Sequence, residues 1–123
     1  MGSLGTAGAA LTATETEVFS GNAPTAWTDL DLSGTVGANA ALVLIKLQNT
    51  TATDMRAVAF RKNGDTDEFW GPGQDDSASG CALVNILMTF HLVLLVATDN
   101  AGKIEWKAEI GAAATIDIIA YIK

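Results

Sequence analysis

The chain has 123 residues, 14 of them acidic and 7 basic, so its formal net charge is −7. A charge of this sign is repelled by phosphate backbones and by anionic membrane surfaces, so we expect neither nucleic acid nor a membrane as a partner. Apolar residues reach 49% while charged residues make up only 17%, which predicts that part of the apolar surface lies at an interface between subunits.

The N-terminal segment is expected to stand apart from the folded domain. Residues 1–14 carry no charged side chain and consist mainly of Gly, Ala, Thr, Ser and Leu, which are too small to build a core. We therefore predict an extended N-terminal arm over residues 1–15 and one folded domain over residues 16–123. The arm is either a disordered tail or a segment that orders against a neighbouring subunit, with Leu4 and Leu11 as its interface residues.

The first half of the domain shows strand patterns separated by turn residues. A short strand is predicted over 16–20, and a second over 26–32, where Trp27 is in phase with two aspartates and is expected at the rim. Residues 40–48 predict an interior strand, residues 49–54 a polar hairpin connection, and residues 55–62 a further strand that ends at a turn.

Residues 66–80 form the longest stretch without a strand pattern. Phe69 and Trp70 stand beside Gly71-Pro72-Gly73, and exposed aromatic residues next to flexible backbone act as interface anchors or stacking platforms. The alternative is that they fold back and cap the open end of the domain. The acidic residues around this loop do not have the spacing of an EF-hand, so we expect them to be solvated.

The segment from Cys81 to Ala97 is strongly apolar. It is interrupted by Asn85, Thr89 and His91 and is short for a membrane span. We predict one long strand, or two joined near Asn85, buried on both faces. His91 is accordingly expected to be a hydrogen-bonded core residue.

The C-terminal part has the clearest strand pattern. From Lys103 to Ile110 charged residues occupy odd positions and apolar residues even ones, which is typical of a half-buried strand. A turn is predicted over 99–102 and a last strand over 115–122, giving a terminal β-meander. Seven to nine strands with closely spaced turns predict an all-β fold, an antiparallel β-sandwich of the jelly-roll or immunoglobulin-like kind.

No set of residues typical of catalysis is found in the sequence. His91 is the single histidine and Cys81 the single cysteine, which cannot supply a histidine metal site or an internal disulfide, and no nucleophile elbow is present. We therefore expect no catalytic residues, metal or cofactor, and a protein that is not an enzyme.

Several short motifs together resemble one family. The motifs are residues 26–32, the run ALVLIKLQN at 41–49, residues 60–65, residues 99–106 and IDIIAYI at 116–122. With these motifs the chain resembles the small β-sandwich modules of tailed-phage virions, which occur as capsid decoration proteins and in tail tips or fibres. The resemblance implies a homotrimer that binds the major capsid protein on the outer surface of the capsid, and a protein made in the host cytoplasm and located in the virion.

A carbohydrate- or receptor-binding module of a tail tip or fibre is the alternative function. In that case Phe69, Trp70 and Trp27 would stack on sugar rings while nearby acids accept hydrogen bonds from hydroxyl groups. Replacement of Trp70 by alanine separates the two, since it would abolish glycan retention in one case and weaken assembly in the other.

Overall fold

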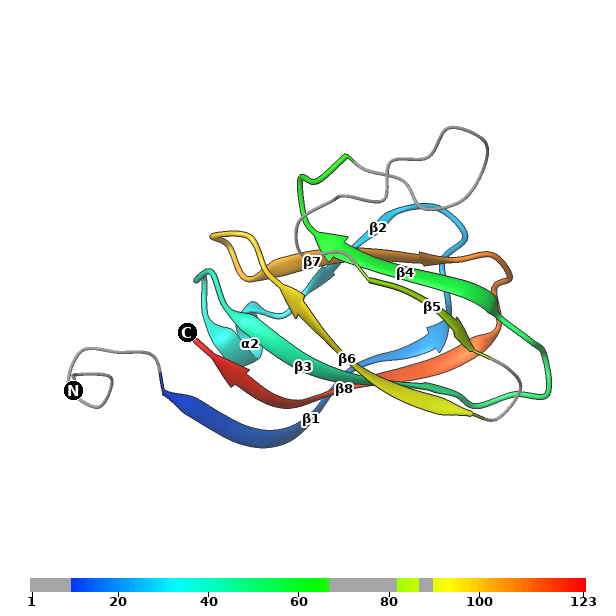
Figure 1. The fold of residues 1–123 in the computed structure, drawn as a ribbon, viewed down its shortest axis with the longest axis horizontal. Helices are drawn as coiled ribbons and strands as arrows, with labels where there is room; N and C mark the ends of the chain where they lie inside the picture. The colour runs from blue at the N-terminus through cyan, green and yellow to red at the C-terminus, as the bar shows by residue number, and fades with distance from the viewer. Residues whose placement is uncertain (1–9, 67–81, 87–89) are drawn as a thin grey trace.

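Two four-stranded antiparallel sheets make up the chain in a computed structural model (Figure 1), which describes residues 10–66, 82–86 and 90–123. Sheet A has the order β1 (Leu11–Asn22), β8 (Ala113–Ile122), β3 (Leu42–Asn49), β6 (His91–Ala97). Sheet B has the order β2 (Thr28–Asp31), β7 (Lys103–Ala108), β4 (Arg56–Lys62), β5 (Ala82–Ile86), and one short helix, α2 (Ser33–Val36), follows β2. The prediction of an all-β fold is confirmed.

The strand pairs are nested along the chain. β1 pairs with β8, β2 with β7, β3 with β6 and β4 with β5. Among the described strands, β4 and β5 are the one consecutive pair that shares a sheet. The predicted hairpin at 49–54 and the predicted terminal meander are therefore wrong, because β3 and β4, and likewise β7 and β8, belong to different sheets. A short polar turn and a half-buried strand pattern suit either connection, which is why the sequence did not separate them.

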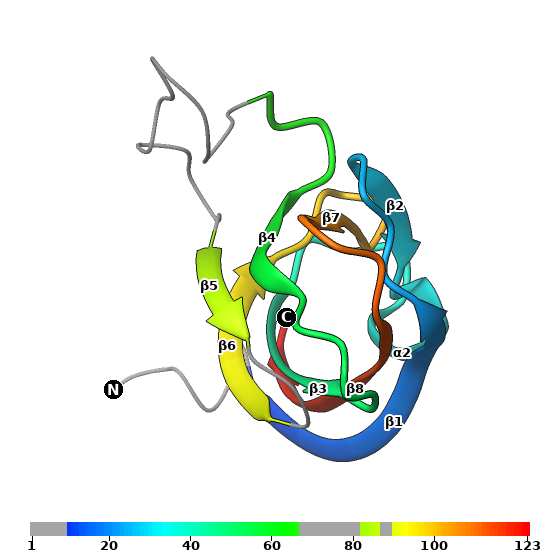
Figure 2. The same cartoon turned by 90° about the vertical axis from the view of Figure 1, so that its right-hand side faces the viewer.

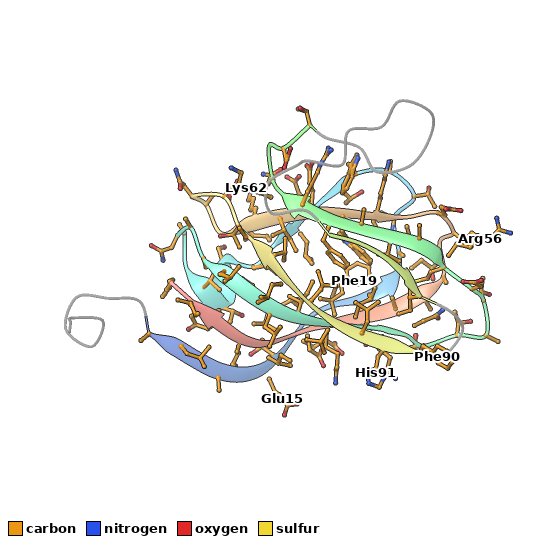
Figure 3. All side chains as sticks on the ribbon, in the orientation of Figure 1. Glu15, Phe19, Arg56, Lys62, Phe90 and His91 are labelled. Carbon is orange, nitrogen blue, oxygen red and sulfur yellow. The ribbon has the colours of Figure 1, made fainter. Side chains whose placement is uncertain are left out.

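The core is built from residues of both sheets. On β3, Val43, Ile45 and Leu47 are fully buried, while β7 contributes Ile104 and Trp106. The Trp106 ring stacks on Phe60 with centroids 5.5 Å apart and meets the edge of Phe19 at 5.0 Å. Figure 3 shows Phe19 pointing between the sheets. Aromatic contacts of this kind give a core large buried area and fixed geometry.

The borders of two predicted segments differ in the structure. β1 begins at Leu11, so residues 11–15, which were expected in the arm, lie in a strand that pairs with β8. Residues 1–9 lie outside the described part of the chain. The apolar segment 81–97 contains two strands, β5 and β6, which belong to different sheets. No helix in the described ranges is long and apolar enough to cross a membrane.

The predicted turn at 99–102 is confirmed, and it is held by one carboxylate. Asp99 accepts hydrogen bonds from the backbone N–H of Ala101 and Lys103, each at 2.9 Å, and from the Asn63 side chain at 3.1 Å. Burial raises the pKa of Asp99, but these hydrogen bonds and the charge of Lys103 outweigh it, so the pKa lies below 3.8. Gly102 has φ +79°, and a Cβ there would lie 2.3 Å from a backbone oxygen of α2's C-cap residue, so glycine is required.

Candidate interaction surface

The outer side of sheet A changes character along the strands. In β3, Val43, Ile45 and Leu47 face the core, and the residues between them point outward. The outward residues are first Leu42 and Leu44 and then the polar Lys46 and Gln48. One end of the sheet is therefore apolar on its outer side, and the other end is polar.

The register of the four strands aligns the outward residues of sheet A in rows that cross the sheet in the order β1-β8-β3-β6. The first row is Leu11, Ile122, Leu42, Ala97; the second is Ala13, Ala120, Leu44, Leu95; the third is Glu17, Asp117, Lys46, Val93. We call the first two rows the apolar face and the third the charged row.

Large side chains of the apolar face are open to solvent. Leu11 is 69% exposed, Leu95 55%, Leu42 41% and Ile122 36%. With Leu44, they border a shallow hollow of about 90 Å³. Single exposed leucines are common on soluble proteins, but several adjacent ones on one sheet make the apolar face a candidate interaction surface.

A β-bulge in β8 places two of these residues on the outside. The register with β3 passes from Ile118 opposite Ile45 to Ala120 opposite Leu44, so that one residue of β8 has no opposite number. As a result Ile118 faces the core, whereas Ala120 and Ile122 face outward and Tyr121 packs against the core. Strict alternation would have turned Ile118, Ala120 and Ile122 to the same side.

The charged row contains one pair of opposing acidic residues and one pair of opposite charge. Glu17 lies opposite Asp117 on neighbouring strands. Lys46 Nζ lies 3.8 Å from Asp117 Oδ2, and both side chains are about a quarter to a third exposed. Acidic residues directly opposite each other destabilise a sheet, and the lysine on the next strand offsets this repulsion.

The outer side of sheet B differs, since it carries a mostly buried ion pair and a tryptophan ring that two cations contact. Arg61 on β4 forms an ion pair with Glu105 on β7, and their side chains are only 8% and 12% exposed. The Arg61 guanidinium also lies 3.7 Å from the ring centre of Trp27, and Lys107 Nζ lies 5.0 Å from it. Trp27 is thus at the rim, as predicted, and its ring is engaged by two cations.

A second hollow lies between β1 and the β2–α2 segment. Its volume is about 260 Å³, and Glu17 and Asp31 are among the residues that line it. The side chain and the backbone N–H of Ser33 donate hydrogen bonds to Asp31 and lower its pKa below 3.8. This carboxylate is therefore committed to the turn that starts α2.

Of the four predicted interface residues, Leu11 lies on the apolar face. Leu4, Phe69 and Trp70 lie outside the described residues. The rest of the apolar face was not identified from the sequence as a site. The available signal was the run of consecutive apolar residues in β3 and β6, which makes both sides of these strands apolar.

Two predictions for the 81–97 segment are wrong. His91 is the first residue of β6 and is exposed on the outer side of sheet A, next to the exposed Phe90 (Figure 3). It is therefore not a core residue. Val93 and Leu95 are 49% and 55% exposed, so β6 is not buried on both faces in the single chain. The pattern of apolar residues in a sequence shows that a side of a strand is apolar. It does not show whether that side lies in the core or on the surface.

Within the described ranges, no group of three or more His, Cys, Asp or Glu side chains is arranged to hold a metal ion. Comparisons of the chain with family profiles, with curated proteins and with solved structures each found no match.

Proposed function

We propose that this chain is a non-enzymatic structural protein of a tailed-phage virion, a capsid decoration or cement protein that binds the outer surface of the capsid as an oligomer. The observation that carries the proposal is the apolar face, where four aliphatic side chains between 36% and 69% exposed lie side by side on one sheet. Such a surface favours contact with protein, and in an oligomer it supplies a contact between copies. The sequence resemblance to virion modules supplies the kind of assembly.

The strand order supports a jelly-roll sandwich as the finer description of the fold. Nested pairs of strands divided between the orders β1-β8-β3-β6 and β2-β7-β4-β5 are what results when one long hairpin is rolled into two facing sheets. In Figure 2, viewed along the sheets, β1, β8, β3 and β6 curve around one side of the core and β2, β7, β4 and β5 cover the other. Jelly rolls of eight strands are used in viral capsid and lectin domains.

Cementing follows from many weak contacts on a fixed lattice. A chain that binds only the assembled shell stabilises that shell by mass action. When several copies are joined, each further contact is made at a high effective concentration, so modest contacts produce tight attachment. The net charge of −7 keeps free copies soluble until a capsid surface is available.

Co-sedimentation tests the proposal. DNA-free capsids of the phage that encodes the chain, assembled without it, are mixed with the purified, labelled chain and pelleted. We expect the chain to pellet in a fixed ratio to capsid subunits, and an excess of unlabelled chain to prevent this. A chain that stays in the supernatant with intact capsids contradicts the proposal.

Glycan or receptor binding in a tail tip or fibre is the second candidate, since lectin domains share the proposed strand order. Within the described residues the aromatic side chain expected to stack on sugars is Trp27, and its ring is engaged by Arg61 at 3.7 Å. This contact favours the structural role. Retention of the chain on a glycan array without capsid binding would favour the second candidate.

A further inference from the structure

We propose that the apolar face is covered by a second copy of this chain, with sheet A of one copy packed on sheet A of the other about a two-fold axis parallel to the strands. The inference deepens the proposed function by naming the contact between copies, and it rests on that function only for the expectation of an oligomer. Three features of the described residues support it.

The first feature is charge. Two copies that each carry −7 repel one another, and contact costs least where neither surface is charged. The two rows of the apolar face contain no ionisable side chain. The outer side of sheet B, by contrast, carries Arg61, Glu105 and Lys107. A copy that docks on these two rows therefore buries mainly aliphatic surface. Glu15, which is exposed on the outer side of β1 between Ala13 and Glu17 (Figure 3), lies at the border of this contact.

The second feature is shape. A two-fold axis parallel to the strands reverses the order β1-β8-β3-β6, so that β1 lies over β6 of the partner and β8 over β3 of the partner. In the first row Leu11 then faces an alanine, Ala97 of the partner subunit. In the second row Ala13 faces Leu95 of the partner subunit, and Ala120 faces Leu44 of the partner subunit.

Large side chains thus meet small ones in three of the four distinct pairs, the exception being Ile122 over Leu42 of the partner subunit. Face-to-face sheets pack with side chains interdigitated about 10 Å apart, and an alternation of large and small residues permits this. The apolar face is complementary to itself under this rotation.

The third feature is the charged row. The same reversal places Asp117 over Lys46 of the partner subunit, and Lys46 over Asp117 of the partner subunit. These residues already lie 3.8 Å apart within one chain, so the dimer would hold two opposite pairs at the border of the apolar contact. Charge and shape therefore favour one and the same axis.

The solution mass of the full chain tests the contact. Light scattering after size exclusion is run over about a hundredfold range of chain concentration, because a higher concentration raises the fraction of chains in a dimer. We expect twice the chain mass for the natural sequence and a return to the single-chain mass for Leu95→Glu, which puts a charge into the contact. Leu95 is 55% exposed, so folding of the variant is checked by circular dichroism and is expected to be unchanged.

Phe90→Glu is the matched control. Phe90 is 59% exposed and directly precedes β6, but it is outside the apolar face. This variant is expected to keep the dimer mass. A single-chain mass for the natural sequence at every concentration, a trimer mass, or a dimer broken by Phe90→Glu and not by Leu95→Glu would each overturn the proposal.

Cross-linking tests the axis. In a Cys81→Ser background, chains with Glu17→Cys are mixed with chains with Val93→Cys and treated with a bifunctional maleimide that reaches about 10 Å, the distance between packed sheets. The proposed axis sets these two positions opposite each other, so we expect cross-linked pairs in the mixture. Within each variant alone the two cysteines are separated by an additional three strand spacings, about 14 Å, so little product is expected.

Cross-linking of the separate variants in preference to the mixture would overturn the axis. The failure of this inference is distinct from that of the proposed function. A single-chain mass together with saturable capsid binding removes the dimer and keeps the decoration role, whereas a dimer without capsid binding does the reverse.

Discussion

The outer sides of the two sheets contrast sharply, although buried and more exposed residues alternate along β3 of sheet A and β7 of sheet B alike. On sheet B the outward residues of β7 are charged, and Glu105 pairs with Arg61 on the neighbouring strand. On sheet A the outward residues at one end are leucines, an isoleucine and alanines, and the largest are 36–69% exposed. Sheet B pairs Arg61 with Glu105 on its outer side, whereas sheet A exposes aliphatic side chains at one end of its outer side.

Stability of the fold and assembly are therefore expected to depend on different sheets. A mostly buried ion pair contributes to the fold only while both partners are present, so the outer side of sheet B should be sensitive to substitution. Exposed leucines add little to the stability of a single chain. Substitutions on the apolar face should therefore leave the fold stable but weaken assembly. Four substitutions test this contrast between the two sheets.

Removal of Arg61 is expected to have the largest effect. Arg61→Ala leaves the Glu105 carboxylate, whose side chain is 12% exposed, without its ion-pair partner, and this should lower the free energy of unfolding by about 3 kcal/mol in urea titrations. Lys62→Ala is the control, because Lys62 is exposed on the same strand. Equal effects of the two substitutions would show that the ion pair does not hold sheet B.

Removal of Trp27 should have a smaller effect. Trp27→Ala deletes the ring that lies 3.7 Å from the Arg61 guanidinium, at a cost of about 1 kcal/mol in the free energy of unfolding. Trp27→Phe keeps an aromatic ring and should recover part of the loss. If phenylalanine were no better than alanine, the cation–π contact would contribute nothing.

Neutralisation of Asp99 should make the stability of the fold less dependent on acid. Its effect on the free energy of unfolding should be smaller than that of either substitution above. The folded-state pKa lies below the ordinary value of 3.8, so the carboxylate stabilises the fold above that pH, and this contribution is lost as the pH falls through the folded-state pKa. In Asp99→Asn the difference in urea midpoint between about pH 6 and about pH 3 should be smaller than in the natural chain. An unchanged difference would argue against this carboxylate as a source of acid sensitivity.

Substitution on the apolar face should have the smallest effect on the fold. Leu95→Thr, measured at a concentration where the chain is a monomer, should change the free energy of unfolding by less than about 0.5 kcal/mol. The side chain is 55% exposed, and threonine suits a strand. A loss comparable to that of Arg61→Ala would mean that the face is part of the fold, and the contrast between the sheets would disappear.

Much of the fold was predictable from local pattern. The alternation in residues 103–108 indicated β7 and its inward Trp106, and the turn at Asp99 followed from residues that tolerate its backbone angles. The pairing of strands was not predictable, because a half-buried strand has the same sequence pattern whether its neighbour in the chain lies beside it or in the opposite sheet. The candidate site was predicted only at Leu11, since its other residues looked like ordinary core positions.

Local pattern in the chain was enough to predict an all-β fold, the approximate place of most strands, and an excess of apolar residues. Where the excess lies on the surface became visible only in the folded chain. Nested pairing set β3 and β6 side by side, and the bulge in β8 turned Ala120 and Ile122 outward beside Leu42 and Leu44. Register and bulges depend on contacts between strands far apart in the chain, and such contacts leave no local mark in the sequence.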